Sequence, residues 1–157
     1  MENETGVTRS GDSLGGVVWD IMGQTYKPVQ LTQSSFAFDA LFPPGTFVPL
    51  HVHPDQDEFI RVLEGGLDLW LDGEDVTASA GDLVRMPMGS KHGIFNRGTA
   101  PARVLFWVAP ARRLYDLFAQ MDGLRAQDEV VRLGAEYNVH FLPPDAWPAS
   151  RYLPDPA

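Results

Sequence analysis

The sequence predicts an all-β fold, a sandwich or barrel of short strands, with a C-terminal two-helix extension. Between residues 16 and 110, segments rich in Val, Leu, Phe and Trp are interrupted by Gly or Pro about every eight to twelve residues, which is typical of sandwiches and barrels. After residue 110 the apolar residues recur with the period of a helix. At 157 residues and 44% hydrophobic residues, the chain suits one globular domain with a sizeable core.

The strands are expected where apolar residues cluster or alternate with polar ones. Leu67, Leu69 and Leu71 would share one face of a strand, because successive side chains in a strand point to opposite faces. The Asp72–Gly73 pair that follows is typical of a two-residue hairpin turn. The other expected strands, in chain order, are 36–42, 46–53, 58–65, 76–82, 93–96 and 103–109.

Residues 111–157 are expected to form a helical extension that ends in a Pro-rich segment. Apolar residues spaced i, i+3, i+4 and i+7 predict an amphipathic helix, and Gly123 is well placed to end it. A second apolar stripe follows, and we expect both stripes to cover an open face of the barrel rather than bind a partner. The stripes are Leu114, Leu117, Phe118 and Met121, then Val130, Leu133 and Tyr137.

The N-terminal residues 1–15 are polar and rich in Gly, Ser and Thr, so we expect a flexible tail. They lack the basic and apolar regions of a signal peptide, and the longest apolar run, residues 104–111, is too short to span a bilayer. The chain has no cysteine, which excludes disulfides and thiolate metal sites and fits a reducing compartment. We therefore expect a cytoplasmic protein with no membrane partner.

The charge distribution argues against nucleic-acid binding. The formal net charge is −9, and only Arg112 and Arg113 are adjacent among the 12 Lys and Arg residues. A polyanion would be repelled on average, and no basic patch offsets that repulsion. We therefore expect no nucleic-acid partner.

Two of the four histidines, His51 and His53, stand one residue apart in the strand expected at 46–53. Alternate side chains of a strand share a face, so both imidazoles can reach one metal ion. The residues 54–57 favour a turn, and a hairpin between segments 46–53 and 58–65 would bring Glu58 beside the two histidines. Two histidines and a carboxylate are a metal-binding set that leaves coordination positions open.

A second segment, residues 81–96, supplies a third histidine. Turn residues at 81–82 and at 87–89 precede His92, which begins the next expected strand. The expected ligands of one divalent transition metal ion are therefore His51, His53, Glu58 and His92. This donor set admits Fe, Mn, Ni, Co, Cu or Zn, so the identity of the metal stays open. His140 lies outside both segments and is expected to be structural or exposed.

These two segments resemble the motifs of the cupin superfamily, in particular its small single-domain members. The first motif (Gly, five residues, HxH, three or four residues, Glu, six residues, Gly) corresponds to 45–65, and the second (Gly, five residues, PxG, two residues, His, three residues, Asn) to 81–96. The resemblance implies a jelly-roll β-barrel over residues 16–110, one metal ion held by the four residues above, and a homodimer. The matching residues are Gly45, His51, His53, Glu58, Gly65, Gly81, Pro87, Gly89, His92 and Asn96.

The flanks are similar to the quercetin-dioxygenase-like subgroup, which often has "PPG" ahead of HxH, as at 43–45, and "FLPP" near the end, as at 141–144. This similarity implies a mononuclear metal-dependent dioxygenase in which Glu58 acts as a base toward a substrate hydroxyl. Two alternatives stay open. One is Lewis-acid isomerisation, cyclisation or lyase chemistry without O₂, for which Tyr26, Gln56 or Asp57 would supply an acid or base. The other is a non-catalytic small-molecule binder.

Alternation along the strands also predicts an apolar pocket beside the ligands. With few fixed cations nearby, such a pocket favours an apolar or aromatic substrate that chelates through its oxygens over a sugar phosphate. The alternative is that these side chains are only barrel core. The pocket residues expected on this basis are Phe47, Ile60, Leu69 and Ile94.

Overall fold

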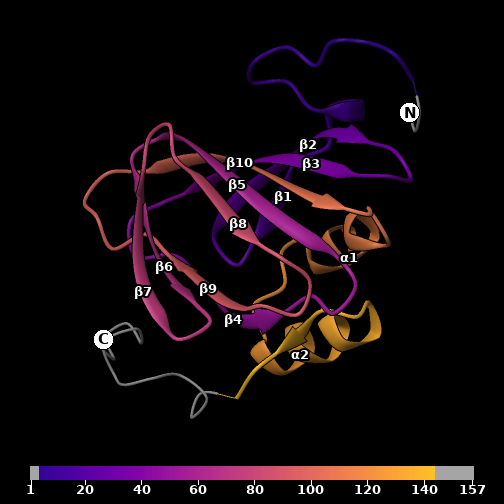
Figure 1. The fold of residues 1–157 in the computed structure, drawn as a ribbon. Helices are drawn as coiled ribbons and strands as arrows, with labels where there is room; N and C mark the ends of the chain where they lie inside the picture. The colour runs from indigo at the N-terminus through magenta and orange to yellow at the C-terminus, as the bar shows by residue number, and fades with distance from the viewer. Residues whose placement is uncertain (1–3, 144–157) are drawn as a thin grey trace.

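The computed structural model describes residues 4–143, in which two antiparallel β-sheets face each other and two helices lie on one side (Figure 1). The strands and helices confirm the predicted all-β jelly roll with a C-terminal two-helix extension. Sheet A contains, in spatial order, β1 (Trp19–Ile21), β2 (Gln24–Leu31), β3 (Phe36–Phe42), β10 (Ala102–Ala109), β5 (Asp57–Glu64) and β8 (Leu83–Met86). Sheet B contains β11 (His140–Phe141), β4 (Phe47–Val52), β9 (Lys91–Phe95), β6 (Gly66–Leu71) and β7 (Glu74–Ser79).

The main core fills the space between the sheets and is rich in aromatic rings from sheet A. Alternate residues of β3 are buried, which follows from the alternation of side chains along a strand. Phe38 stacks on Phe106 of β10, with ring centroids 4.9 Å apart and ring planes within 5° of parallel. Such stacked rings add to the stabilisation that burial alone provides. A second, smaller cluster of Leu50, Trp70 and Phe95 belongs to sheet B.

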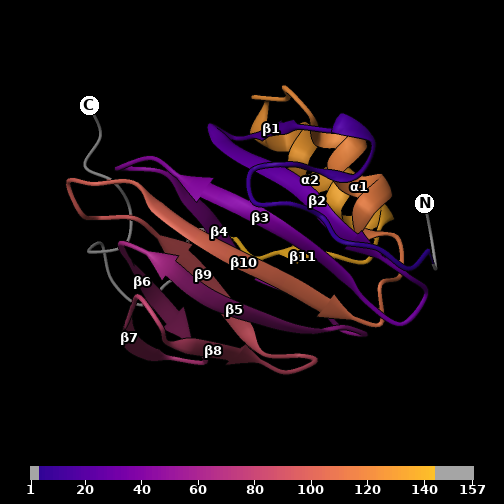
Figure 2. The same ribbon diagram turned by 90° about the horizontal axis from the view of Figure 1, so that it is seen from above.

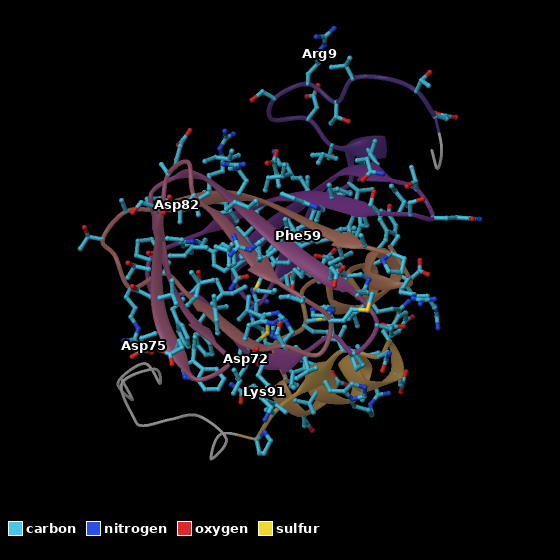
Figure 3. The ribbon with its side chains drawn as sticks, in the orientation of Figure 1. Arg9, Phe59, Asp72, Asp75, Asp82 and Lys91 are labelled. Carbon is cyan, nitrogen blue, oxygen red and sulfur yellow. The ribbon has the colours of Figure 1, made fainter. Side chains whose placement is uncertain are left out.

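The predicted hairpin turn joins β6 to β7. Asp72 has φ of 46° and Gly73 has φ of 98°, the two positive values that a tight turn of this kind requires. Asp72 also bonds to Lys91 of β9: the Lys91 backbone N–H donates to Asp72 Oδ1 at 2.7 Å, and the Asp72 N–H donates to the Lys91 carbonyl oxygen at 2.9 Å. Figure 3 shows these two residues side by side. The turn therefore also fixes the start of β9, which carries His92.

The two helices are α1 (Leu114–Met121) and α2 (Gln127–Glu136). All four residues of the first predicted stripe are buried, whereas Leu133 and Tyr137 of the second are partly buried against the core. Helix α1 contacts β1 and helix α2 contacts β11, and in both views the helices lie on the opposite side of the barrel from β6 and β7 (Figure 2). Neither helix of the described region has the length and apolar character that crossing a membrane would require.

The extension also returns a strand to the barrel. In β11, His140 pairs with Val52 and Phe141 pairs with His51, so a segment far along the chain completes the edge of sheet B. The sequence predicts only helices and a Pro-rich end for 111–157, because two residues are too few to show alternation. The Pro-rich residues 144–157 lie outside the described residues.

The described part of the N-terminal segment, residues 4–13, runs beside β2. Thr8 Oγ1 donates to the Val29 carbonyl oxygen at 2.7 Å, and Lys27 Nζ donates to the Gly11 carbonyl oxygen at 2.9 Å. Arg9 lies at the outer end of this segment, away from the barrel (Figure 3). None of residues 4–13 is buried in the interior of the barrel. The flexibility of this segment stays a prediction.

The expected hairpin between segments 46–53 and 58–65 is wrong. Strand β4 pairs with β9 and β11 in sheet B, whereas β5 pairs with β10 and β8 in sheet A. Both edges of each strand are thus occupied by other partners. The turn at residues 53–56 carries the chain from one sheet to the other, so Glu58 approaches the histidines from the opposite wall of the barrel.

The Gly65→Ala substitution should destabilise the protein more than Gly73→Ala. Gly65 has φ of 74°, and a Cβ there would lie 2.7 Å from the Pro101 carbonyl oxygen, whereas the space around Gly73 is open. We expect a loss of about 1–2 kcal/mol for Gly73→Ala from backbone strain alone, and a further loss of about 1–3 kcal/mol for Gly65→Ala from the collision. Urea unfolding followed by circular dichroism measures both losses, and equal values would contradict the collision argument.

Candidate metal centre

The four predicted ligands meet inside the barrel. His51, His53, Glu58 and His92 are all buried, and each has a ligand atom within 4.8 Å of those of the other three. His51 of β4 and His92 of β9 are direct cross-strand neighbours, and His53 follows the end of β4. Glu58, near the start of β5, is the one member that comes from sheet A. The fold therefore brings together residues from two separate motifs and from both sheets.

Glu58 lies at the centre of this group. Its Oε2 is 2.8 Å from His92 Nε2 and 3.2 Å from His53 Nε2. The ring of His51 lies 4.2 Å from that of His92 and 5.0 Å from that of His53, measured between centroids. Three imidazole nitrogens and one carboxylate oxygen thus surround a common point.

The opposite ring nitrogens of the three histidines all face acceptors. His51 Nδ1 lies 2.7 Å from the Pro49 carbonyl oxygen, and His92 Nδ1 lies 3.3 Å from that of Ser90. His53 Nδ1 lies 3.0 Å from Gln56 Oε1. A proton on each Nδ1 would satisfy these acceptors, and the Nε2 lone pairs would then be available to a metal. This arrangement and the donor types fit a divalent transition metal ion.

Gln56 fixes the orientation of His53. Its side chain is 3% exposed, and Nε2 donates to the carbonyl oxygens of Pro110 and Ala111, at 3.0 and 2.8 Å. Because the amide nitrogen faces two carbonyl oxygens, Oε1 must be the atom that accepts from His53. Gln56 therefore ties a metal ligand to the segment that leads into α1, and its position does not favour the acid–base role considered from the sequence.

Burial and charge set the protonation of the group. Burial, followed by the neighbouring imidazoles, holds the pKa of His51 well below its ordinary value. Burial alone would raise the pKa of Glu58, but His53 and His92 outweigh it and hold that pKa well below its usual range. Burial would likewise lower the pKa of His53, but Glu58 raises it on balance. A metal bound here would replace the proton of His53, so binding should weaken as pH falls.

An apolar pocket adjoins the group. His51, His53 and Glu58 line it together with apolar side chains from both sheets and from α1. Phe47 and Ile94, two of the four predicted pocket residues, are among the lining residues. The other two, Ile60 and Leu69, are buried in the core and are not part of the lining. The reason is the position of the pocket, which extends toward β1, β2 and α1 rather than farther along β5 and β6.

The remaining sequence candidates occupy three different settings. Tyr26 is buried and lines the pocket. Asp57 accepts a hydrogen bond from the Met88 backbone N–H at 2.9 Å and belongs neither to the pocket lining nor to the ligand group. His140 is exposed, as predicted, and its Nε2 lies 2.8 Å from Asn138 Oδ1. Gln24, which no sequence pattern singled out, is also buried in the pocket wall.

Comparison with known proteins identifies related sequences over the barrel. Residues 38–108 match the family model described as "Cupin domain". The tetracenomycin polyketide synthase protein TcmJ of Streptomyces glaucescens is 37% identical over 67 residues, which are 43% of this chain and 45% of that protein. Quercetin 2,3-dioxygenase of Bacillus subtilis (strain 168) is 48% identical over 48 residues, which are 31% of this chain and 14% of that enzyme. The matches thus span less than half of either relative.

A solved structure shares the fold. The structure of KdgF from Halomonas sp. superimposes with a TM-score of 0.64 and covers 71% of this chain and 99% of that one. The sequence identity is 22%, so this likeness concerns the architecture alone.

The His51→Ala and His92→Ala substitutions should each remove most of the bound metal, because each deletes one of four converging ligands. His140→Ala is the matched control and should retain the metal, since its ring faces solvent and Asn138. Mass spectrometry of metal content in protein purified without a His-tag measures the difference. An equal loss in His140→Ala would contradict the ligand assignment.

The Gln56→Leu substitution should weaken metal binding by about 10- to 100-fold, the usual effect of removing a partner that orients a ligand. Competition with a chromophoric chelator for Zn²⁺ gives the affinity. Gln30→Leu is the control, because Gln30 also forms side-chain hydrogen bonds, to Thr32 and Ser35, but has no contact with the ligands. Unchanged affinity in Gln56→Leu would show that His53 keeps its orientation without the amide.

The match over residues 38–108, the jelly-roll architecture and the buried group of three histidines and one glutamate agree with one another. Together they support the assignment of this barrel to the cupin superfamily.

Proposed function

We propose that the protein is a mononuclear metal-dependent dioxygenase of quercetinase type. Its substrate would be an aromatic hydroxyketone, a planar apolar molecule with neighbouring hydroxyl and carbonyl oxygens. One observation carries the proposal: three of the four ligand residues, His51, His53 and Glu58, also line an apolar pocket. A molecule in that pocket would therefore meet the open side of the metal centre.

The chemistry of the pocket supports this substrate class. The lining is almost entirely apolar, and it includes the rings of Phe38, Phe47 and Phe106. No Lys or Arg belongs to the described lining, so a phosphate group would have no cation to bind. An aromatic ring system gains from burial against such walls, and two of its oxygens can chelate a metal at the polar end.

A bound transition metal would supply a chelation point for the hydroxyketone and a means of activating O₂. The protein supplies the remaining functions. Glu58 has a depressed pKa and is therefore ionised, which leaves its carboxylate without a proton. It could accept the proton of the substrate hydroxyl once a bound metal had made that hydroxyl more acidic. The apolar walls exclude water from the reacting oxygens.

The similarity to quercetin 2,3-dioxygenase supports the proposal over the segment that they share. That segment is a small part of the enzyme, so the similarity supports the type of metal centre more than the choice of substrate. The similarity to a tetracenomycin polyketide synthase protein, also over less than half of its length, supports a polyketide as a second kind of substrate.

A Lewis-acid reaction on the same substrate class, without O₂, is the second candidate. The specific observation in its favour is Tyr26, a polar group in the pocket wall that is not a metal ligand. Burial, followed by the nearby Glu58 charge, raises the pKa of Tyr26, so its hydroxyl stays protonated and would act through a hydrogen bond rather than by releasing its proton. Turnover in the absence of O₂ would favour this candidate.

Oxygen uptake tests the proposal. Protein loaded separately with Fe²⁺, Ni²⁺, Cu²⁺ or Zn²⁺ is mixed with quercetin or an aromatic diketone in an oxygen electrode, and product formation is followed in parallel under N₂. We expect O₂ consumption that depends on substrate and on at least one redox-active metal. Product formation that is equal with and without O₂ would favour the Lewis-acid candidate, and saturable binding with no product would favour a binding protein.

The Glu58→Gln substitution should lower the rate of O₂ uptake by at least about 100-fold, because the amide can neither accept the hydroxyl proton nor bind the metal as a carboxylate does. Asp57→Asn is the matched control, since Asp57 is the adjacent carboxylate and is not part of the ligand group. Normal turnover by Glu58→Gln at equal metal content would contradict the role of Glu58 as the base.

A further inference from the structure

Gln24 is a buried amide with an unsatisfied donor. Its side chain is 1% exposed, and Nε2 has no hydrogen-bond partner within the described region. Three other buried polar groups share this lack of a partner there, on Trp70, Ser90 and Arg103. Of these four residues only Gln24 lines the pocket beside the metal centre. A buried polar group without a partner is rare in folded proteins and calls for an explanation.

Tyr26 fixes the direction in which the amide points. The Tyr26 hydroxyl donates to Gln24 Oε1 at 2.7 Å, and both residues face the interior from β2. Because this bond occupies the carbonyl end of the amide, the NH₂ end is the one left without an acceptor. If the amide were turned over, the Tyr26 hydroxyl would have no acceptor for its proton. One buried group would therefore still lack a hydrogen-bond partner.

Tyr26 is itself held by aromatic neighbours. Its ring lies 4.9 Å from that of Phe38 and 5.1 Å from that of Phe118, which stands edge-on. Phe118 belongs to α1, so the helix and sheet A together fix the position of the tyrosine. The Gln24 amide is therefore a preorganised donor in an apolar wall, which is how polar groups confer specificity in small-molecule sites.

We infer that Gln24 is a specificity-determining residue whose amide N–H binds an oxygen of the substrate at a distance from the metal-chelating pair. This inference rests on the proposed function and deepens it. The occupant would be an aromatic hydroxyketone that carries a further hydroxyl or carbonyl oxygen on a remote ring. A hydrocarbon ring at this position would leave the N–H unsatisfied.

Gln24 and Glu58 approach the pocket from different strands of sheet A. Strands β3 and β10 lie between β2, which carries Gln24, and β5, which carries Glu58. The oxygen that meets the Gln24 amide therefore belongs to a different part of the ligand from the pair that chelates the metal.

Two probes and one double variant test the inference. Isothermal titration calorimetry under N₂, on metal-free and on Zn²⁺-loaded protein, gives the Kd of quercetin and of unsubstituted flavonol, which keeps the chelating pair but lacks the ring hydroxyls. The double variant Gln24→Met/Tyr26→Phe removes both partners of the hydrogen bond while preserving the volume, so it should fold at least as stably as the wild type. Gln30→Met, in the same strand and outside the pocket lining, is the control.

We expect quercetin to bind about tenfold more tightly than flavonol to the wild-type protein and to the Gln30→Met control. In the double variant this preference should disappear, through weaker binding of quercetin and with little change for flavonol. In the Tyr26→Phe single variant, the preference for quercetin should be intermediate. The Gln24 amide is then still present, but the hydrogen bond from the Tyr26 hydroxyl that orients it is lost.

A quercetin preference that persists in the double variant would overturn the role of Gln24, whatever the stability of that variant, and would leave the proposed function intact. Failure of the wild-type protein to bind either probe would overturn both the substrate class and the inference. Preserved binding with the predicted loss in the double variant, but no O₂ uptake, would support the subsite and count against the dioxygenase reaction alone.

Discussion

The contact between the Glu58 carboxylate and the imidazoles of His53 and His92 is the interaction on which the interior of this barrel depends. A carboxylate that is 4% exposed would be strongly unfavourable without partners, and its partners come from the facing sheet. The contact therefore joins the two walls of the jelly roll at one polar point in an otherwise aromatic and aliphatic core. Gln56, which bonds to His53, is itself buried and fully bonded.

A chain of supporting contacts extends from this point into the C-terminal extension. Gln56 joins His53 to the carbonyl oxygens that precede α1, and Phe141 of β11 lies 5.5 Å from His51, ring to ring. The helices and β11 are therefore part of the environment of the metal centre as well as a cover for the core. Their contacts help to orient two of the three ligand rings, those of His53 and His51, before any metal binds.

The ligand set could be predicted from the sequence because its spacing has a direct geometric meaning. Residues i and i+2 of a strand share a face, so His51 and His53 could be placed together without knowledge of the fold. The Asp72–Gly73 turn could be predicted in the same way, since few dipeptides adopt two positive φ values. The apolar spacing of α1 likewise identified every residue that the helix buries.

Other features depend on contacts that no local pattern records. Whether β4 pairs with β5 or with β9 is decided by how the whole barrel closes, and the sequence favoured the nearer partner, which is wrong. Gln24 is a single polar residue at the start of a strand, and nothing in its neighbourhood distinguishes it from a surface glutamine. The residues of α1 that line the same pocket come about 90 residues later in the chain, so no local pattern could place Gln24 beside them.

The pocket wall has two origins, and this division bears on how such proteins diversify. The histidines and the glutamate lie within the matched segment 38–108, whereas Gln24, Tyr26 and Phe118 lie outside it. The proposed metal ligands are thus encoded inside the matched segment, whereas part of the pocket wall is encoded on either side of it. Exchange of the flanking stretches between relatives would therefore alter that part of the wall and leave the four ligand residues unchanged.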